Sequence, residues 1–364
     1  MKVAVDCYEV VEYSTGVGRV IDNILISLID ILPEFSFFVF TREHIKKYSD
    51  KNVNQSVIPS PKGYFRWQNG PFIKKLKDIE PDLLIAPNYT IPFFNRWKSI
   101  VIEHDISFVT HPEWFSKKEA VMKKYLVKRS LKKSTSILTV SEFSKNEIIK
   151  NFDINPEKIK VFLHGVEDRF KRRSENEINE WKEQKGLKNT KIIGYLGSIF
   201  NRRNIPLLVE SVNRIREELP DTILYVIGKD LTHPPQNISK LLNKDWIKWD
   251  AVIDDAELSL FYSSIDAFAY LSEYEGFGLP PLEVLACGTV PVLLNKTSLK
   301  EIYKDMAIMV DVPDVHKIKE ALMTAIKDEE RKEAVLSRFS EKRPQFSWPK
   351  IAKEFSLLIE SLLP

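Results

Sequence analysis

The chain has 364 residues, and at roughly 150 residues per domain this length favours two domains over one. Hydrophobic residues make up 43% and charged residues 29%, which is the composition of an ordinary globular protein and excludes disordered, collagen-like and coiled-coil chains. Lysine and arginine total 54 against 51 acidic residues, so the net charge of +3 argues against a dedicated nucleic-acid-binding protein.

The cysteines and the N-terminal sequence are those expected of a protein in the cytoplasm. Cys7 and Cys287 are far apart and lack histidines at the spacing of a zinc site, so a reduced compartment is expected. The start MKVAVDCYEVV has no long apolar segment with a small-residue cleavage site, and no stretch reaches the roughly 18 apolar residues of a membrane span. We expect a cytoplasmic protein, soluble or peripheral at the inner face of the plasma membrane.

Short β-branched runs alternate with longer segments of helical period in the first half of the chain. This alternation is typical of a parallel sheet covered by helices. Strands are predicted at Val3–Asp6, Phe35–Phe40, Leu83–Ala86, Ser99–Glu103, Ile137–Val140 and Lys160–Leu163. The clearest helices between them are Arg19–Leu32 and Glu142–Asn151, and Ser141 is placed to cap the second.

A polar stretch from Arg169 to Asn189 separates this series from a second one, so we predict a domain of residues 1–168 and another of 169–345. The second series has predicted strands at Ile192–Leu196, Thr222–Ile227, Ala267–Leu271 and Val290–Leu293, and predicted helices at Ile205–Glu218, Asp255–Ser263 and Leu282–Ala286. The pattern predicts two Rossmann-like, doubly wound α/β domains, with the ligand site in a cleft between them.

The segment from Glu275 to Glu283 combines a glycine-rich turn with two carboxylates. Gly276 and Gly278 let the backbone approach a ligand, and the helix start near Leu279 can receive a phosphate. The two carboxylates can accept hydrogen bonds from the hydroxyls of a sugar. Alternatively, these residues only end a strand and begin a helix. The register Glu-x7-Glu around Gly-Phe-Gly-Leu-Pro resembles the donor-site signature of family 4 retaining glycosyltransferases of the GT-B type.

Another segment, which carries two arginines, agrees with that resemblance. Arg202 and Arg203 follow a predicted strand and precede a helix, where cations are unfavourable unless an anion binds. The resemblance implies that this pair grips the donor diphosphate, with Arg203 in the position of the family's lysine. The resemblance also places Ser198 among the donor-binding residues, at a position where some members have an additional arginine for the phosphates.

Three further segments match the family in order along the chain. The resemblance implies that Gly16 and Val17, in the loop Ser14–Arg19, close over the donor phosphates. It implies that His104 reaches the donor sugar, and that backbone groups from Trp249 to Val252 read the nucleobase, with Asp255 capping the next helix. The remaining donor-binding positions are Gly276, Phe277, Gly278, Leu279 and Glu283, the last on the ribose. His164 is expected to be a structural or hinge residue, and residues 346–364 to form the closing helix that packs back onto the first domain.

The resemblance implies transfer of a hexose from a nucleotide sugar with retention at the anomeric carbon. Arg202 and Arg203 would stabilise the leaving diphosphate, Glu275 would hold the sugar, and His104 would orient it. No Asp-x-Asp motif is present, and we expect no metal and no other cofactor. The first candidate reaction is transfer of mannose from GDP-mannose to a glycan or lipid-linked glycan acceptor in cell-surface polysaccharide synthesis.

Other functions stay open at this point. The chain could use a UDP-sugar or another nucleotide sugar on a different acceptor, or bind a nucleotide sugar without transferring it. An epimerase or a phosphorylase with the same architecture fits less well, because the 2-epimerases lack the Glu-x7-Glu register and a phosphorylase needs a cofactor lysine and far more chain.

The acceptor side of the sequence offers two features, each with two interpretations. Lysines and arginine crowd the segment Lys117–Lys133 against a single acid, Glu119. This helical segment either rests on an anionic membrane surface or presents an ordinary solvated face. Aromatic residues in the first half either stack on an acceptor sugar or pack in the core: Phe65, Trp67, Tyr89, Phe93, Phe94, Trp97, Phe108, Trp114 and Phe115.

Overall fold

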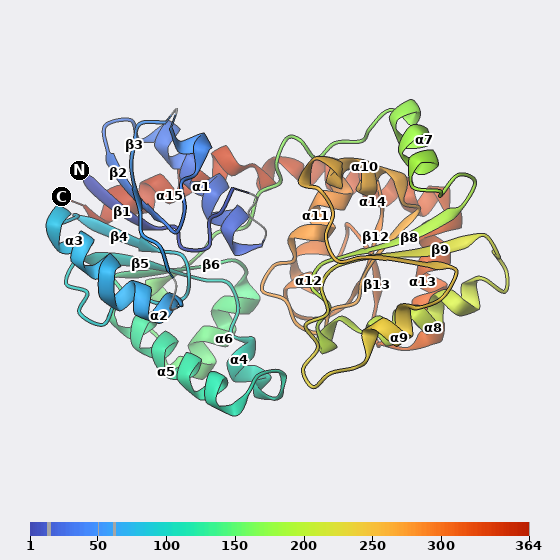
Figure 1. The fold of residues 1–364 in the computed structure, drawn as a ribbon, viewed down its shortest axis with the longest axis horizontal. Coiled ribbons are helices and arrows are strands. Elements are labelled where there is room, and N and C mark those ends of the chain that lie inside the picture. The colour runs from blue at the N-terminus through green and yellow to red at the C-terminus, as the bar shows by residue number, and fades with distance from the viewer. Residues whose placement is uncertain (13–15, 50, 61–62, 364) are drawn as a thin grey trace. The chain divides into compact units, whose positions relative to one another are not determined.

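The computed structural model describes residues 1–12, 16–49, 51–60 and 63–363. It divides the chain into two compact units: a first unit of Met1–Gly165 with Gln345–Pro364, and a second unit of Val166–Pro344. Each unit is a parallel sheet with helices on both faces (Figure 1).

The first unit is built on a seven-stranded sheet within the described residues. Its strands are β1 (Lys2–Asp6), β2 (Ser36–Thr41), β3 (Val53–Val57), β4 (Leu83–Ala86), β5 (Lys98–Glu103), β6 (Ser136–Thr139) and β7 (Ile159–Val161). They run parallel in the order β3-β2-β1-β4-β5-β6-β7, with Val3 opposite Phe37 on one side and Leu83 on the other. Because β1 is buried on both faces, its sequence is an almost continuous apolar run.

Seven α-helices of the described chain belong to the first unit: α1 (Val17–Ile31), α2 (Tyr64–Trp67), α3 (Ile73–Ile79), α4 (Ser107–Thr110), α5 (Lys117–Lys133), α6 (Glu142–Phe152) and α15 (Trp348–Leu362). The hydroxyl of Ser141 accepts a hydrogen bond from the backbone N–H of Ser144, which confirms the predicted cap of α6. The C-terminal helix α15 packs on α1. It buries Ile351, Phe355 and Ile359.

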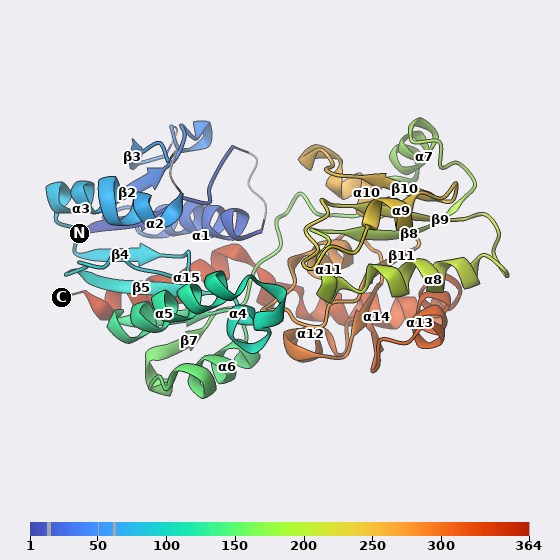
Figure 2. The ribbon, with the colours of Figure 1, turned by 60° about the horizontal axis from the view of Figure 1, so that its bottom comes forward.

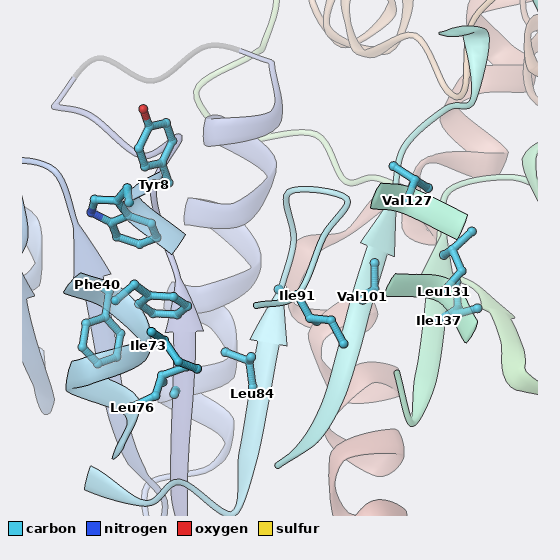
Figure 3. Packing of buried hydrophobic residues seen from close by; sticks show 14 of the residues in the cluster. Tyr8, Phe40, Ile73, Leu76, Leu84, Ile91, Val101, Val127, Leu131 and Ile137 are labelled. Atoms are coloured by element: carbon cyan, nitrogen blue, oxygen red, sulfur yellow. The ribbon is translucent and has the colours of Figure 1, made fainter. Parts of the chain in front are cut away.

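One face of this sheet carries a large apolar cluster, part of which is drawn in Figure 3. Aromatic residues of α2 and of the segment after it fill one end, with Trp67 stacked on Phe72 at 4.7 Å between ring centroids. At the other end Val127 and Leu131 of α5 join Ile137 in the same cluster. The inner face of α5 is therefore fixed to the sheet by apolar packing.

The second unit is built on a six-stranded parallel sheet, again within the described residues, with the order β10-β9-β8-β11-β12-β13. Its strands are β8 (Lys191–Leu196), β9 (Thr222–Ile227), β10 (Ile247–Asp250), β11 (Ala267–Tyr270), β12 (Pro291–Leu294) and β13 (Ile308–Val310). Its helices, seen from two sides in Figures 1 and 2, are α7 (Glu175–Gln184), α8 (Ile205–Ile215), α9 (Ile238–Leu242), α10 (Leu258–Ser264), α11 (Leu279–Ala286), α12 (Thr297–Tyr303), α13 (Val315–Lys327) and α14 (Glu329–Lys342).

Two local predictions need correction. Asp254, not Asp255, caps the turn that leads into α10, since its carboxylate accepts from the N–H of Ala256 at 2.9 Å. Asp255 instead forms an ion pair with Arg169. Helix α11 begins at Leu279, which confirms the helix start expected there and corrects the shorter range Leu282–Ala286, because Pro280 and Pro281 fit the first turn of a helix.

The chain leaves the first unit after Gly165 and re-enters it at Gln345. Inside the first unit Gly165 lies directly against Trp348, since a Cβ added at this glycine would be 2.7 Å from the indole. The ring of His164 lies 6.0 Å from the same indole. No helix in the described ranges is long and apolar enough to span a bilayer.

Candidate donor-binding site

The strand order of the second unit reverses between β8 and β11. In open parallel sheets the loops after the two strands at such a reversal form a crevice in which ligands bind. The loop after β8 leads through a turn at Asn201–Arg203, and the loop after β11 leads to Gly278 and α11. These two loops carry the predicted residues Arg202, Arg203 and Glu275.

The structure brings Arg203 and Glu275 together as an ion pair. Nη2 of Arg203 lies 3.0 Å from Oε1 of Glu275, and both side chains are about nine-tenths buried. The hydroxyl of Ser272 donates to the same carboxylate oxygen at 2.6 Å. The guanidinium also lies over the ring of Tyr270, 4.3 Å from its centroid. Sequence alone gave these residues separate ligand roles and did not predict their mutual contact.

Arg203 keeps its charge in this buried place. Burial by itself lowers the pKa of its guanidinium, but the Glu275 carboxylate and the neighbouring tyrosine rings outweigh burial and raise the pKa above the ordinary value. Its Nε and Nη1 atoms are buried without a hydrogen-bond partner among the described residues. A permanent cation with unused donors can receive an anionic ligand.

The loops around the pair are tied to each other by further contacts. The N–H of Glu273 donates to the carbonyl of Arg202 at 2.9 Å, and the side-chain amide of Asn204 donates to Glu273 at 3.0 Å. Arg202 lies 4.0 Å from Glu275 and places its guanidinium over the ring of Phe200. Lys296 forms an ion pair with Glu273. The two loops therefore hold each other in place through backbone and charged groups.

The glycine-rich segment provides a sharp turn into α11. Gly278 has φ of +89°, a conformation that favours glycine, and its carbonyl accepts from the hydroxyl of Tyr303 at 2.6 Å. Gly276 is buried, and the ring of Phe277 packs against that of Tyr303. Among the first three helix positions only Leu279 carries a backbone N–H, because two prolines follow it. This helix start therefore offers a phosphate fewer backbone donors than a helix start without prolines.

Glu283 lies on α11 with its side chain buried. Its Oε2 accepts a hydrogen bond from the hydroxyl of Tyr262 at 2.8 Å. Its predicted role on the ribose stays a prediction.

The candidate base-reading residues, Trp249 to Val252, occupy the end of β10 and the loop that follows it. The indole of Trp249 donates to the carbonyl of Gly228 at 2.9 Å, and Val252 is exposed. Gly228 itself approaches the loop after β8, since a Cβ there would be 2.0 Å from the carbonyl oxygen of Gly197. Ser198 accepts through its carbonyl from the hydroxyl of Tyr195 at 3.0 Å. The loops after β8, β9 and β10 thus adjoin one another.

The predicted residues of the first unit lie at the carboxyl ends of its strands. His104 follows β5, and its Nε2 lies 3.1 Å from the carbonyl of Pro87. Because a carbonyl only accepts, Nε2 carries the proton. Burial lowers the pKa of the His104 ring, so the ring is neutral at pH 7. Its centroid is 5.8 Å from that of His164.

The predicted glycine loop is described only in part. Gly16, with φ of +52°, directly precedes α1, and Val17 is the first residue of that helix. Ser14 and Thr15 lie outside the described residues.

A polar network that sequence reasoning missed occupies the end of β1. Asp6 is fully buried, and its carboxylate accepts from the hydroxyl of Tyr64 at 2.8 Å and from the N–H of Tyr8 at 3.1 Å. The amide of Gln68 donates to the Tyr64 hydroxyl and to the carbonyl of Thr90, both at 2.7 Å. Burial raises the pKa of Asp6 to about 7, although these hydrogen bonds oppose the rise. The sequence feature that could have indicated this network is an aspartate, Asp6, at the end of a buried strand.

Within the described residues, no group of three or more histidine, cysteine, aspartate and glutamate side chains is arranged to hold a metal ion.

Two family models match the chain, one on each unit. The model described as Glycosyltransferase Family 4 matches residues 14–170, and the model described as Glycosyl transferases group 1 matches residues 177–343. The chain belongs to the family 4 glycosyltransferases, as the sequence motifs predicted.

Individual relatives and solved structures agree with this assignment. The chain is 28% identical over 277 residues to O-antigen chain mannosyltransferase B of Escherichia coli, covering 75% of this chain and 72% of that protein. It is 27% identical over 259 residues to O-antigen chain mannosyltransferase RfbU of Salmonella typhimurium, covering 71% and 67%. The structure of Anabaena HepE in complex with UDP and glucose superimposes with a TM-score of 0.77 at 17% identity, over 99% of this chain and 100% of that one. The predicted GT-B fold is confirmed.

Proposed function

We propose that this glycosyltransferase transfers a hexose, with mannose from GDP-mannose as the first candidate, to a glycan or lipid-linked glycan acceptor in cell-surface polysaccharide synthesis. The choice of mannose and of this pathway is supported by the names of the O-antigen mannosyltransferases to which the chain is similar. The choice of a nucleotide sugar is supported by one observation, the buried Arg203–Glu275 pair at the strand reversal of the second unit.

The proposed reaction retains the configuration at the anomeric carbon. Arg203 and Arg202 would bind the diphosphate and stabilise the negative charge that grows on it as the glycosidic bond breaks. The acceptor hydroxyl would attack on the face from which the diphosphate leaves, and a diphosphate oxygen would take its proton. Glu275 would hold the sugar hydroxyls. Because its Oε1 already faces Arg203 and Ser272, this carboxylate is a weak candidate for a covalent nucleophile.

We also propose that transfer needs no metal ion, since two arginines supply the positive charge that a divalent cation would otherwise provide. Turnover should be unchanged after treatment with EDTA. A reversible loss of turnover on chelation, restored by Mg²⁺ or Mn²⁺, would contradict this part of the proposal.

Thermal unfolding with nucleotides tests the donor. A ligand at a hundred times its dissociation constant stabilises the folded state by about 2.7 kcal/mol, so the correct nucleotide raises Tm visibly. We expect GDP and GDP-mannose to raise Tm more than UDP or ADP and their sugars. The variant Arg203→Met should lose the shift, and Lys350→Gln, an exposed change on α15, should keep it. Absence of a shift with every nucleotide would contradict the enzyme hypothesis.

A UDP-sugar donor is the second candidate, because the structure of Anabaena HepE to which this chain is similar holds UDP and glucose. A larger Tm shift with UDP than with GDP would favour it. A protein that binds a nucleotide sugar without transferring it is the remaining alternative. Release of nucleotide diphosphate that increases with added acceptor would exclude that alternative.

We further propose a cytoplasmic protein with a peripheral contact between α5 and an anionic membrane surface. Lys117, Lys118, Lys124, Lys128 and Lys132 are exposed on this helix and form no ion pair within the described ranges. Each basic side chain near an anionic surface contributes about 1 kcal/mol to attraction. Flotation with anionic vesicles at low salt should carry the protein, and no flotation would contradict the contact.

A further inference from the structure

The first two residues of α12 hold the backbone of Glu275 through their hydroxyls. The N–H of Glu275 donates to the hydroxyl of Thr297 at 3.3 Å, and the hydroxyl of Ser298 donates to the carbonyl of Glu275 at 2.8 Å. Ser298 is fully buried, and Thr297 is half-buried. The two hydroxyls therefore pair both backbone polar groups of the residue that the proposed reaction places on the donor sugar.

The same helix supports the far end of the glycine-rich turn. Leu299 is buried against Gly278, since a Cβ added at this glycine would lie 2.9 Å from the Leu299 side chain. The hydroxyl of Tyr303 donates to the carbonyl of Gly278 at 2.6 Å. Helix α12 thus contacts the turn both at Glu275 and at Gly278, so the position of the turn depends on this helix.

The backbone of Thr297 is strained. Its φ of +51° lies in the left-handed region, which β-branched residues adopt rarely. Such strain persists only where the surrounding structure imposes it, and strained residues cluster at functional sites. A glycine would adopt this φ without the cost but has no hydroxyl to accept from Glu275. The position therefore carries a strained residue whose side chain supplies a hydrogen-bond acceptor.

The backbone contacts complement those of the Glu275 carboxylate. Its Oε1 has the Ser272 hydroxyl at 2.6 Å and Nη2 of Arg203 at 3.0 Å. These partners fix the end of the side chain, while Thr297 and Ser298 fix the backbone from which it starts. A carboxylate held at both ends is preorganised, and preorganised charge stabilises a transition state without having to rearrange during the reaction.

We propose that Thr297 and Ser298 are positioning residues for sugar transfer, which act through Glu275 and do not touch the donor. This inference rests on the sugar-holding role proposed above for Glu275 and adds to it a third loop, the one that follows β12. A displacement of a reacting group by about 1 Å can cost about a hundredfold in rate. Small shifts of the Glu275 backbone should therefore lower kcat.

Conservative substitutions separate the hydroxyls from the rest of the side chains. T297V and S298A should each lower kcat about tenfold, because each leaves one backbone group of Glu275 without its partner. T297S keeps the hydroxyl and should transfer at the rate of the parent. T297G adopts the φ of this position freely but lacks the hydroxyl, so its kcat should fall as that of T297V does.

Nucleotide binding and a double-mutant cycle test whether the effect passes through Glu275. The probe is GDP, or UDP if UDP raises Tm of the parent more, and T297V and S298A should keep the parent's Tm shift because Arg202 and Arg203 are unchanged. In the background of E275Q, adding T297V or S298A should lower kcat less than about twofold, since residues that act through one group are not additive. A full tenfold loss in that background would overturn the proposal.

The second unit offers matched controls. The hydroxyl of Thr222, at the start of β9, donates to the carbonyl of Leu219 at 2.8 Å, and that of Ser211 donates to the carbonyl of Val315 at 3.1 Å. Both residues are fully buried. T222V and S211A repeat the chemistry of the two test variants away from Glu275. They should lower Tm by a comparable amount and leave kcat unchanged.

The possible failures are distinguishable. If T297V and S298A transfer at the rate of the parent, the inference is wrong and the proposed function stands. If T222V and S211A lose as much rate as the test variants, Thr297 and Ser298 are structural residues only, and the inference is again wrong. If the parent neither transfers a sugar nor gains Tm with any nucleotide, the proposed function is wrong and the inference fails with it.

Discussion

Where the strand order reverses, between β1 and β4 in the first unit and between β8 and β11 in the second, both units gather polar side chains. In the second unit the buried acid, Glu275, faces the cation Arg203 at 3.0 Å. In the first unit the buried acid, Asp6, accepts hydrogen bonds from the described part of the chain through neutral donors alone, those of Tyr64, Tyr8 and Gln68.

This difference shows that the same topology carries an ion pair in one unit and a network of neutral hydrogen-bond donors around an acid in the other. The charged crevice of the second unit suits an anion, because a ligand can take over donors of Arg203 that the protein leaves unused. The neutral network of the first unit offers hydrogen bonds without net charge, which suits hydroxyls better than phosphates. Measurements on the two acids and their hydrogen-bond and ion-pair partners can test this difference between the units.

The largest effect expected is the pH dependence of stability that Asp6 causes. Its pKa in the folded protein is about 7 and its ordinary value is 3.8, so the folded state holds the proton more tightly. Stability from this group is fully present below pH 4 and is lost as pH rises to about 7, by about 4 kcal/mol in total. Urea unfolding of the parent and of Asp6→Asn at pH 5 and pH 8 measures the part of this loss that falls above pH 5, about 3 kcal/mol.

The asparagine variant imitates the protonated carboxyl and should lose this dependence. Relative to the parent, Asp6→Asn should therefore be more stable at pH 8 than at pH 5. An unchanged difference between the two proteins at both pH values would mean that Asp6 is ionised in the fold, and the contrast between the two crevices would disappear.

The next effect concerns the cation of the second unit. Arg203→Met should lower kcat of transfer on the order of a hundredfold, because one donor to the developing diphosphate charge is lost. Arg203→Lys should keep part of the rate, since it keeps the charge and loses the two-pronged geometry. Steady-state release of nucleotide measures this effect, and Tm of each variant controls for folding. A rate for Arg203→Met close to that of the parent would remove Arg203 from the proposed mechanism.

The smallest effect compares one hydrogen bond in each crevice. Ser272→Ala removes a donor to the Glu275 carboxylate and should lower the free energy of unfolding by about 2 kcal/mol. Thr90→Val removes a hydrogen bond between neutral groups, from its hydroxyl to Gln68 at 3.2 Å, and should cost about 1 kcal/mol. Chemical denaturation resolves both. Equal losses would show that the charge of Glu275 adds nothing to its hydrogen bond.

Most of the architecture could be predicted because buried parallel strands and amphipathic helices have distinct patterns. Strands β1, β4 and β9 were predicted with the observed limits or within one residue of them. The missed strands are the short or edge ones, β3, β10 and β13. β3 reads Val-Asn-Gln-Ser-Val, and an edge strand that packs on one neighbour needs little apolar sequence. Helix α7 was not predicted because it lies in a highly charged stretch, although its capping box of Ser174 and Glu177 is a recognisable helix-start pattern.

The residues of the candidate site were predicted from the sequence, but the contacts that they make with one another were not. Arg203 and Glu275 come from loops far apart in the sequence, and only the pairing of β8 with β11 brings them together. The choice between Asp254 and Asp255 as a cap could not be made, since either aspartate fits the pattern and the ion pair of Asp255 with Arg169 decides it. The network around Asp6 depends on Tyr64 and Gln68 of another loop, which no local pattern indicates.

The return of α15 to the first unit has a consequence for synthesis. Residues 1–165 of the first unit leave the ribosome before the second unit, yet the helix that covers α1 is translated after the whole second unit. Domains generally fold as units during synthesis. Here the second unit can complete its fold before α15 is available. During that time the first unit still exposes the apolar face of α1, which Ile351, Phe355 and Ile359 of α15 later cover. A stop codon placed just before Trp348 would therefore damage the first unit, although it removes only residues that follow the second.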